Sequence, residues 1–245
     1  MRPPAVTKSS IPINTKSRKH DDSEGSPSAE AFRKRTARPF RVLQNKQEST
    51  VRKLIAALQI SVDGFIEGPN GELDWAMAED DETWKDVFEM LESVDMCILG
   101  RVMYPDYEQY WLAVLADPTA NLPLSGKPAT TNETAYARWA NQTPHIVLSR
   151  TLDKVAWETT RIVRNVEEIG KIKQQPGKNI YVIGGATFVS SLMNAGLVDE
   201  VRLMVNPVVL GRGKPLFKDV KERHALTLLR AKPLKSGKVS LTYRT

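Results

Sequence analysis

Four short runs of mostly apolar residues recur along the chain, each bounded by polar residues or glycine. They are Lys53–Ile60, Met96–Leu99, His145–Leu148 and Ile180–Ile183. Such runs, rich in β-branched residues and without polar alternation, are typical of strands that are covered on both faces. The pattern therefore predicts a sheet whose central strands lie between two other layers.

Between these runs the apolar residues recur at helical spacing. Trp84, Val87, Phe88 and Leu91 mark one face of a helix that begins with acidic residues, where the helix dipole favours them. Further helices are expected after Gly100–Arg101 as far as Trp111, over Ala135–Asn141, and over Phe188–Met193. The prolines, glycine and threonines of Ala116–Asn132 indicate a loop long enough to act as a lid or a binding edge.

The last third of the chain has a different pattern. Val201, Leu203 and Val205 alternate with more polar neighbours, which is typical of a half-exposed strand. We also expect a short strand at Val155–Trp157 and another element near Ile162–Val166. Two antiparallel strands are expected at Leu226–Arg230 and Val239–Tyr243. The whole pattern predicts an α/β fold in which buried strands alternate with helices and antiparallel strands close one edge of the sheet.

Three of the buried runs end in glycine or in a polar residue followed by arginine. Gly100 and Arg101 follow one run, Ser149 and Arg150 the next, and Gly184 and Gly185 the last. Ligands of open α/β sheets gather at the carboxyl ends of the strands, and this set of residues suits a phosphate-rich cofactor. Arg150 is a candidate partner for the 2′-phosphate of NADPH, with Ser149 donating a hydroxyl. The alternative for each arginine is an ordinary surface charge.

The strand, glycine turn and helix around Gly184 and Gly185 admit two interpretations. Free backbone N–H groups at the start of a helix, next to residues without Cβ atoms, would bind a dinucleotide pyrophosphate. Alternatively, the glycines serve a tight turn that needs positive φ.

The net charge of +6 is unevenly distributed. Residues 1–53 hold 13 Lys and Arg against 5 Asp and Glu, a net charge of +8, and residues 54–245 hold 22 against 24, a net charge of −2. We therefore expect residues 1–50 to form a disordered basic leader, or to reflect a start site assigned too far upstream, and residues 51–245 to form the folded domain. The charge of the domain gives no support to nucleic-acid binding, which would have to involve the leader.

Cysteine and histidine are scarce. Cys97 is the one cysteine, which excludes a disulfide within the chain and favours a reducing, cytoplasmic location, and the three scattered histidines make a metal site improbable. No apolar run approaches the roughly 20 residues that span a bilayer, so no membrane association is expected.

Five segments appear in the order found in dihydrofolate-reductase-like proteins. They read LIAALQISVDGFIEG, ILGRVMY, IVLSRTL, YVIGGATF and VDEVRLMVNPVVLGRGKPLF, and the resemblance covers about residues 51–245. In these segments the chain most resembles the reductase half of the bifunctional riboflavin-biosynthesis deaminase–reductase and its stand-alone bacterial relatives. The zinc ligands of the deaminase half are absent.

The resemblance implies a three-layer dihydrofolate-reductase-like fold with a mostly parallel central sheet, NADPH across the strand ends, and a homodimer. It assigns NADPH binding to Gly100, Arg101, Ser149, Arg150 and the segment Gly184, Gly185, Ala186 and Thr187. It also places Asp63 in the loop that closes over nicotinamide and substrate.

The acid that would hold and protonate the acceptor is less clearly assigned. Asp81, three residues before Trp84, resembles the acid of dihydrofolate reductases, although Asp80, Glu82 or Asp74 could take the same position. The alternative is that these acids only stabilise the start of a helix.

These features favour an NADPH-dependent reductase with a pyrimidine-like or pterin-like acceptor, closer to the riboflavin-pathway reductase than to true dihydrofolate reductase. A nucleotide-binding stress or regulatory protein without turnover, using the same pocket, is the alternative.

Overall fold

The structure is a computed structural model that describes residues 51–76, 80–123 and 125–245. The predicted leader, residues 1–50, lies outside the described residues.

An eight-stranded sheet organises the described chain, in the order β5-β4-β3-β6-β1-β7-β10-β9. The strands from β5 to β7 pair in parallel, whereas β10 pairs antiparallel with both β7 and β9. The strands of this sheet are β1 Leu54–Ser61, β3 Val94–Gly100, β4 His145–Leu148, β5 Thr160–Val163, β6 Asn179–Ile183, β7 Val198–Asn206, β9 Thr227–Pro233 and β10 Val239–Arg244. The mostly parallel sheet with an antiparallel edge is therefore confirmed.

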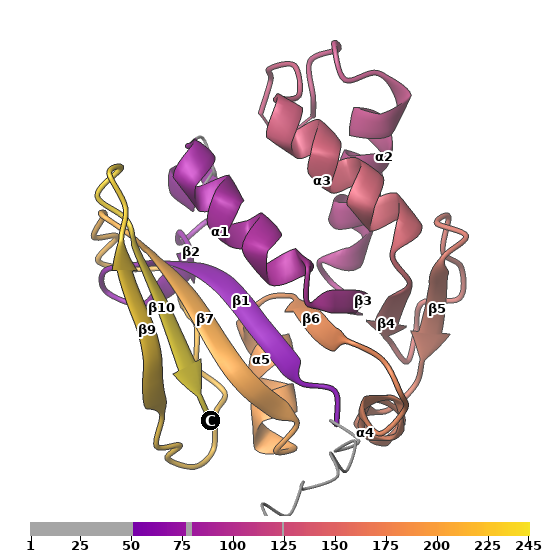
Figure 1. Ribbon diagram of the computed structural model, residues 1–245, viewed down its shortest axis with the longest axis vertical. Coiled ribbons are helices and arrows are strands. Elements are labelled where there is room, and N and C mark those ends of the chain that lie inside the picture. The colour runs from indigo at the N-terminus through magenta and orange to yellow at the C-terminus, as the bar shows by residue number, and fades with distance from the viewer. Residues whose placement is uncertain (1–50, 77–79, 124) are drawn as a thin grey trace, which may run out of the picture. The chain divides into compact units, whose positions relative to one another are not determined.

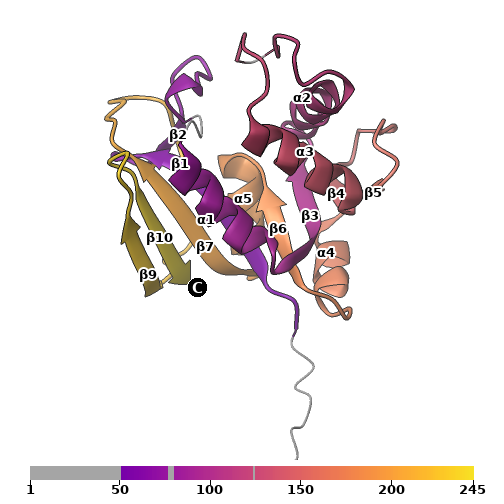
Figure 2. The same ribbon diagram turned by 45° about the horizontal axis from the view of Figure 1, so that its top comes forward.

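Helices cover the sheet on both faces, as Figures 1 and 2 show from two directions. Helices α1, α2 and α3 lie on one face, and α4 and α5 lie on the other. The helices are α1 Asp81–Leu91, α2 Tyr104–Ala116, α3 Thr131–Gln142, α4 Val166–Lys173 and α5 Ala186–Asn194. A single 3₁₀ turn, Asp74–Ala76, precedes α1. A separate two-stranded ladder joins β2 Phe65–Glu67 to β8 Lys214–Pro215.

The unbroken apolar runs are explained by this burial on both faces. Leu54 and Ala56 of β1 pack into the core shared with α4 and α5, while Ile55 between them packs toward α1, α2 and α3. The central strands thus carry apolar side chains at most positions, because successive side chains point to opposite faces and both faces are covered.

One expectation between β4 and β6 was wrong. Val155–Trp157 forms no strand, because the N–H groups of Ala156 and Trp157 donate to the Glu108 carboxylate instead of to a neighbouring strand. The strand lies at Thr160–Val163, and the element expected near Ile162–Val166 spans the end of β5 and the start of the unpredicted helix α4.

The loop between α2 and α3 covers residues 117–130. Leu122 in this loop is buried against Tyr110, Val114 and Ala137. The loop therefore packs on the two helices that it connects, and its described residues line neither of the two pockets presented below.

Candidate functional site

The three strand ends singled out in the sequence lie side by side. Gly100 at the end of β3 pairs with Leu148 of β4, and Leu99 pairs with Ile183 of β6. Ser149 and Gly184 each follow their strand by one residue. All three predicted segments therefore meet at one stretch of the carboxyl edge of the sheet, where ligands of parallel sheets bind.

A cleft of about 660 Å³ opens at this edge. Its lining comprises Arg101 after β3, Leu148–Thr151 after β4, Arg164–Glu167 at the start of α4, and Ser191 on α5. The volume lies within the range of small-molecule and cofactor sites.

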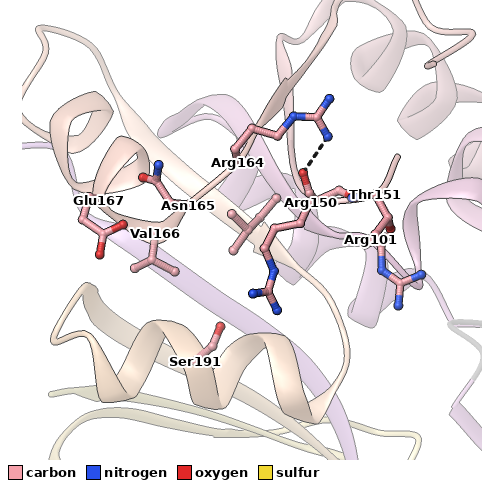
Figure 3. A pocket seen from close by; sticks show the side chains of 10 residues that line it. Arg101, Arg150, Thr151, Arg164, Asn165, Val166, Glu167 and Ser191 are labelled. Carbon is pink, nitrogen blue, oxygen red and sulfur yellow. Dashed lines mark hydrogen bonds between the residues drawn. The ribbon is translucent and has the colours of Figure 1, made fainter. Parts of the chain in front are cut away.

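Arg101 and Arg150 make this cleft positively charged. Both side chains are exposed, and in the part of the chain that the structure describes neither takes part in an ion pair. Figure 3 shows Arg150 extending from the end of β4 toward the helix that carries Ser191. Unpaired guanidinium groups that line a cleft are suited to bidentate binding of phosphate.

The Arg164 side chain is hydrogen-bonded to the loop after β4, unlike those of Arg101 and Arg150. Its Nη1 donates to the carbonyl oxygens of Ser149, at 3.0 Å, and Leu152, at 2.8 Å, the first of which is the dashed line in Figure 3. Asn165, the next residue, begins α4 as half of a capping box with Glu168. This side of the cleft was not predicted from the sequence, although an Asn followed three residues later by Glu is a readable sign of a helix start.

Ser149 is buried, and its hydroxyl oxygen is already engaged. It accepts hydrogen bonds from the backbone N–H groups of Leu152, at 2.8 Å, and Thr151, at 3.2 Å. Ser149 therefore holds the loop that presents Arg150. Its predicted donation to the cofactor stays a prediction.

In the turn after β6, the lack of a side chain has a different structural cause at Gly184 than at Gly185. Neither lies at positive φ, so the interpretation as a left-handed turn was wrong. A Cβ atom on Gly184 would lie 2.5 Å from Cδ1 of Phe188, and one on Gly100 would lie 2.9 Å from the same side chain. Close packing of Phe188 thus explains why Gly100 and Gly184 lack side chains.

Close packing does not explain why residue 185 is a glycine. Its φ of −78° and ψ of 177° are open to any residue, and the nearest atom to an added Cβ would be Cδ1 of Ile66 at 3.9 Å. It precedes the first turn of α5 without a side-chain cap, where backbone N–H groups are available to an anion. Of the two glycines, Gly185 is therefore the one whose lack of a side chain is not required by packing within the protein.

Ala186 and Thr187 can contribute mainly through their backbone. The Ala186 side chain is fully buried, and the Thr187 hydroxyl donates to the Asp219 carboxylate at 2.9 Å. Their N–H groups lie in the first turn of α5, consistent with the position that the resemblance assigns to them.

Asp63 lies in the turn after β1 and connects it to the loop that follows β7. Its carboxylate accepts hydrogen bonds from Ser61 Oγ at 2.6 Å and from the N–H groups of Gly211, at 2.7 Å, and Leu210, at 3.2 Å. The Ser61 hydrogen bond, with those from the two backbone groups, lowers the pKa of Asp63. A carboxylate that stays ionised is a poor proton donor at neutral pH, so these contacts support a role in holding the loops.

The candidate acids near the start of α1 also have structural partners. Asp81 is exposed and accepts a hydrogen bond from Asn132 at 2.9 Å, away from both pockets. Asp80 caps the helix by accepting from the Thr83 N–H at 2.7 Å, and the Glu82 carboxylate accepts from the Lys235 N–H at 2.7 Å. Asp74 is exposed in the 3₁₀ turn.

A second, smaller pocket of about 110 Å³ lies between α1 and the strands β1, β6, β7 and β10; we call it the inner pocket. Its lining includes Gln59, Thr83, Asp86, Arg202 and Ser240. Among the described residues, Asp86 supplies the one carboxylate of this lining, and its side chain is 11% exposed. Asp86 was not among the residues predicted from the sequence. The available sign was an acid one position before Val87, within the apolar face of the expected helix.

Comparison with known proteins now identifies the family. A profile of the RibD C-terminal domain matches residues 52–240. The chain belongs to the RibD C-terminal domain family. Within it, the chain is 36% identical over 193 residues to the uncharacterized protein YyaP of Bacillus subtilis, which covers 78% of this chain and 94% of YyaP.

Solved structures show the same fold at low sequence identity. A putative riboflavin biosynthesis protein from Shewanella sp. PV-4 superposes with a TM-score of 0.56 at 20% identity, over 78% of this chain and 98% of that one. The deaminase/5-amino-6-(5-phosphoribosylamino)uracil reductase of Thermotoga maritima gives a TM-score of 0.51 at 14% identity, over 79% of this chain and 56% of that one.

Membership of the RibD C-terminal domain family carries a general functional statement. The family is one of reductase domains related to riboflavin biosynthesis, and the dihydrofolate-reductase-like fold expected from the resemblance is confirmed. None of the helices in residues 51–76, 80–123 and 125–245 has the length and apolar character that a membrane span requires.

Proposed function

We propose that this member of the RibD C-terminal domain family is an NADPH-dependent reductase. Its acceptor is a small pyrimidine-like or pterin-like molecule, and among known activities it is most like the 5-amino-6-(5-phosphoribosylamino)uracil reductase of the riboflavin pathway. The observation that carries the proposal is the cleft lined by Arg101 and Arg150, which opens at the same carboxyl edge of the sheet as the glycine turn after β6.

The residues of the cleft fit the anionic parts of NADPH. Arg150 and Arg101 would hold phosphate oxygens, with Arg150 on the 2′-phosphate, and the N–H groups at the start of α5 would face the pyrophosphate. Arg164 and Ser149 keep the loop that carries Arg150 in place. A reduced nicotinamide cofactor, when bound, supplies a hydride.

The protein's contribution to the reaction is then mainly positioning. The cleft lies at the end of β4, and the inner pocket lies against β1, three strands away in the sheet. Neighbouring strands are about 4.8 Å apart, so the two sites are separated by roughly 14 Å along the edge. The cleft is lined from α4 and α5 and the inner pocket from α1, which cover opposite faces of the sheet, so an elongated dinucleotide that reached both would cross the carboxyl edge. Holding the two reactants together there would be the main contribution of the protein to catalysis.

The first prediction tests cofactor selection. Arg150→Ala should weaken NADPH binding by about 1.5–3 kcal/mol, the cost of a lost charged hydrogen bond, and should leave NADH binding nearly unchanged. Titration calorimetry with both cofactors measures this difference. Arg161→Ala, which removes an exposed arginine of β5 outside the cleft, is the matched control.

Equal weakening for both cofactors would refute the role of Arg150. Oxidation of NADPH in the presence of a panel of pyrimidine and pterin acceptors separates a reductase from a nucleotide-binding protein without turnover. NADPH binding without oxidation by any acceptor would favour the second class.

The homodimer implied by the resemblance is part of the same proposal. Strand β9 forms one edge of the main sheet, and Leu228 and Leu229 on it are 53% and 51% exposed. An edge strand with exposed leucines offers unpaired backbone groups and apolar area to a second copy of the chain. This surface supports a dimer that leaves the cleft, at the end of β4, accessible.

A further inference from the structure

Glu167 is an acidic residue of the cleft, and the proposed binding of phosphates gives it no role. It lies in the first turn of α4 and lines the cleft together with Arg101 and Arg150. In the view of Figure 3, Val166 lies between Glu167 and Arg150, and Arg101 lies on the far side of Arg150. A carboxylate repels a phosphate group beside it, so an acid in a cleft for phosphates needs a separate explanation.

The capping of α4 leaves the Glu167 carboxylate unused. The capping box is made by Asn165 and Glu168, and the Glu168 carboxylate also accepts a hydrogen bond from the Arg164 N–H at 2.9 Å. The Glu167 side chain is exposed, and no residue in the described ranges hydrogen-bonds or ion-pairs with it. Its one structural role would be a favourable interaction of its charge with the helix dipole.

The Glu167 and Arg150 sides of the cleft are held to each other. Nη1 of Arg164 donates to the carbonyl oxygens of Ser149, at 3.0 Å, and Leu152, at 2.8 Å. These two carbonyl groups belong to the loop that carries Arg150, and Arg164 comes directly before the cap of α4. A ligand that binds Arg150 would therefore meet the first turn of α4 in a fixed position.

An adenosine group has the chemistry that this side of the cleft can accept. With its 2′-phosphate on Arg150, its flat ring would find apolar surface on Leu148 and Val166, which both line the cleft. The amino group of adenine is a hydrogen-bond donor, and an ionised carboxylate is only an acceptor. Guanine and hypoxanthine present a carbonyl oxygen at the same ring position, which a carboxylate would repel.

We propose that Glu167 is a specificity-determining residue of the cleft, which accepts a hydrogen bond from the adenine amino group and so selects adenine over hypoxanthine or guanine. This inference rests on the proposed function and extends it from the phosphates of the cofactor to its base. It accounts for an unpaired acid beside two unpaired arginines, because the adenosine part of NADPH carries both an anionic group and a donor.

The test compares NADPH with its deamino analogue, in which hypoxanthine replaces adenine, by titration calorimetry on the full chain. The wild type should bind NADPH roughly 5- to 20-fold more tightly, a modest ratio for a hydrogen bond to a charged group because the carboxylate is exposed. In Glu167→Gln the ratio should fall below about threefold, since an amide can accept from an amino group or donate to a carbonyl. Asp106→Asn, which neutralises an exposed first-turn acid of α2 outside the cleft lining, should keep the wild-type ratio.

The outcomes separate this inference from the proposed function. Equal wild-type affinity for the two cofactors, or the wild-type ratio retained in Glu167→Gln, would overturn the inference and leave NADPH binding standing. Binding of neither cofactor would overturn the proposed function as well. The melting temperature of Glu167→Gln should fall by at most about 2–4 °C, and such a fall with an unchanged ratio would show that Glu167 serves the helix alone.

Discussion

The adjacent residues Gly184 and Gly185 show that a glycine can be required by close packing within the protein or by an approaching ligand. Gly184 is required by the ring of Phe188, whereas the space over Gly185 is free of protein atoms to 3.9 Å. Packing does not require glycine at position 185, which lies at the start of a helix, and the proposed cofactor would account for it if its phosphates approach the backbone there.

The two glycines should therefore respond differently to substitution. Gly185→Val should abolish NADPH binding because its side chain fills the space over the turn, and should cost no more than about 1 kcal/mol of stability for the change at the helix cap. Gly184→Ala should lower the melting temperature, because overpacking against Phe188 costs about 1–3 kcal/mol.

Thermal unfolding and cofactor titration of both variants measure these effects. If Gly185→Val binds NADPH as the wild type does, the open space is not part of the cofactor site. If Gly184→Ala is as stable as the wild type, the Phe188 contact is not the reason for that glycine.

At this scale the sequence predicted the strand-end residues better than the acids. Gly100, Ser149 and Gly184 could be placed together because each follows a recognisable buried strand. Asp63 and Asp81 could not be assigned, because their partners Gly211 and Asn132 are distant in sequence. Asp86 was missed because its pocket exists only after β10 has paired with β7 and come to lie opposite α1.

At the scale of elements, α1 is attached to the antiparallel edge of the sheet largely by charges. Its cap residue Asp80 pairs with Lys238, and its first-turn Glu82 accepts from the Lys235 N–H. Asp86 in the next turn accepts from Ser240 of β10. A polar attachment of this kind leaves room for the inner pocket, which a close-packed apolar contact would fill.

The cap of α1 gives a pH-dependent prediction. Burial alone would raise the pKa of Asp80, but the hydrogen bonds from Thr83 and the nearby Lys238 lower it below 3.8. The stabilisation by this carboxylate is therefore complete above its unfolded pKa and is lost as the pH falls through the folded pKa. Asp80→Ala should cost about 1 kcal/mol of unfolding free energy at neutral pH and less at about pH 3.

Denaturant unfolding at both pH values measures the difference. Asp81→Ala is the comparison, since Asp81 has no capping role and should cost less than the cap does. An Asp80→Ala difference of equal size at both pH values would show that the ionised carboxylate is not its source.

The elements themselves were predicted where burial shapes the sequence most strongly. Each of the four central apolar runs became a strand, and the helix positions expected around Trp84 and Phe188 are those of α1 and α5. The error fell between β4 and β6. There, apolar Trp157 packs from an irregular segment into the aromatic cluster around His145, a tertiary contact that periodicity cannot reveal.

At the scale of the whole molecule, charge divides the chain at about the same place as the start of the core. Residues 1–53 carry a net charge of +8 and residues 54–245 a net charge of −2, while the first core side chain of the described range is Leu54. Arg52, just before it, already pairs with Asp95. The contacts that organise the domain therefore begin within two residues of Val51.

This division predicts that the first 50 residues are not needed for folding or cofactor binding. A variant that begins at Val51 should match the full chain in melting temperature and in NADPH affinity, because it keeps Arg52, the whole sheet and the cleft. It should also have the same molar mass by light scattering, since the proposed dimer surface lies on β9. Trypsin should cleave the full chain at the Lys and Arg residues before Arg52 and then stop. A truncated variant that melts several degrees lower, or that loses NADPH binding, would show instead that the basic segment contributes to the folded domain.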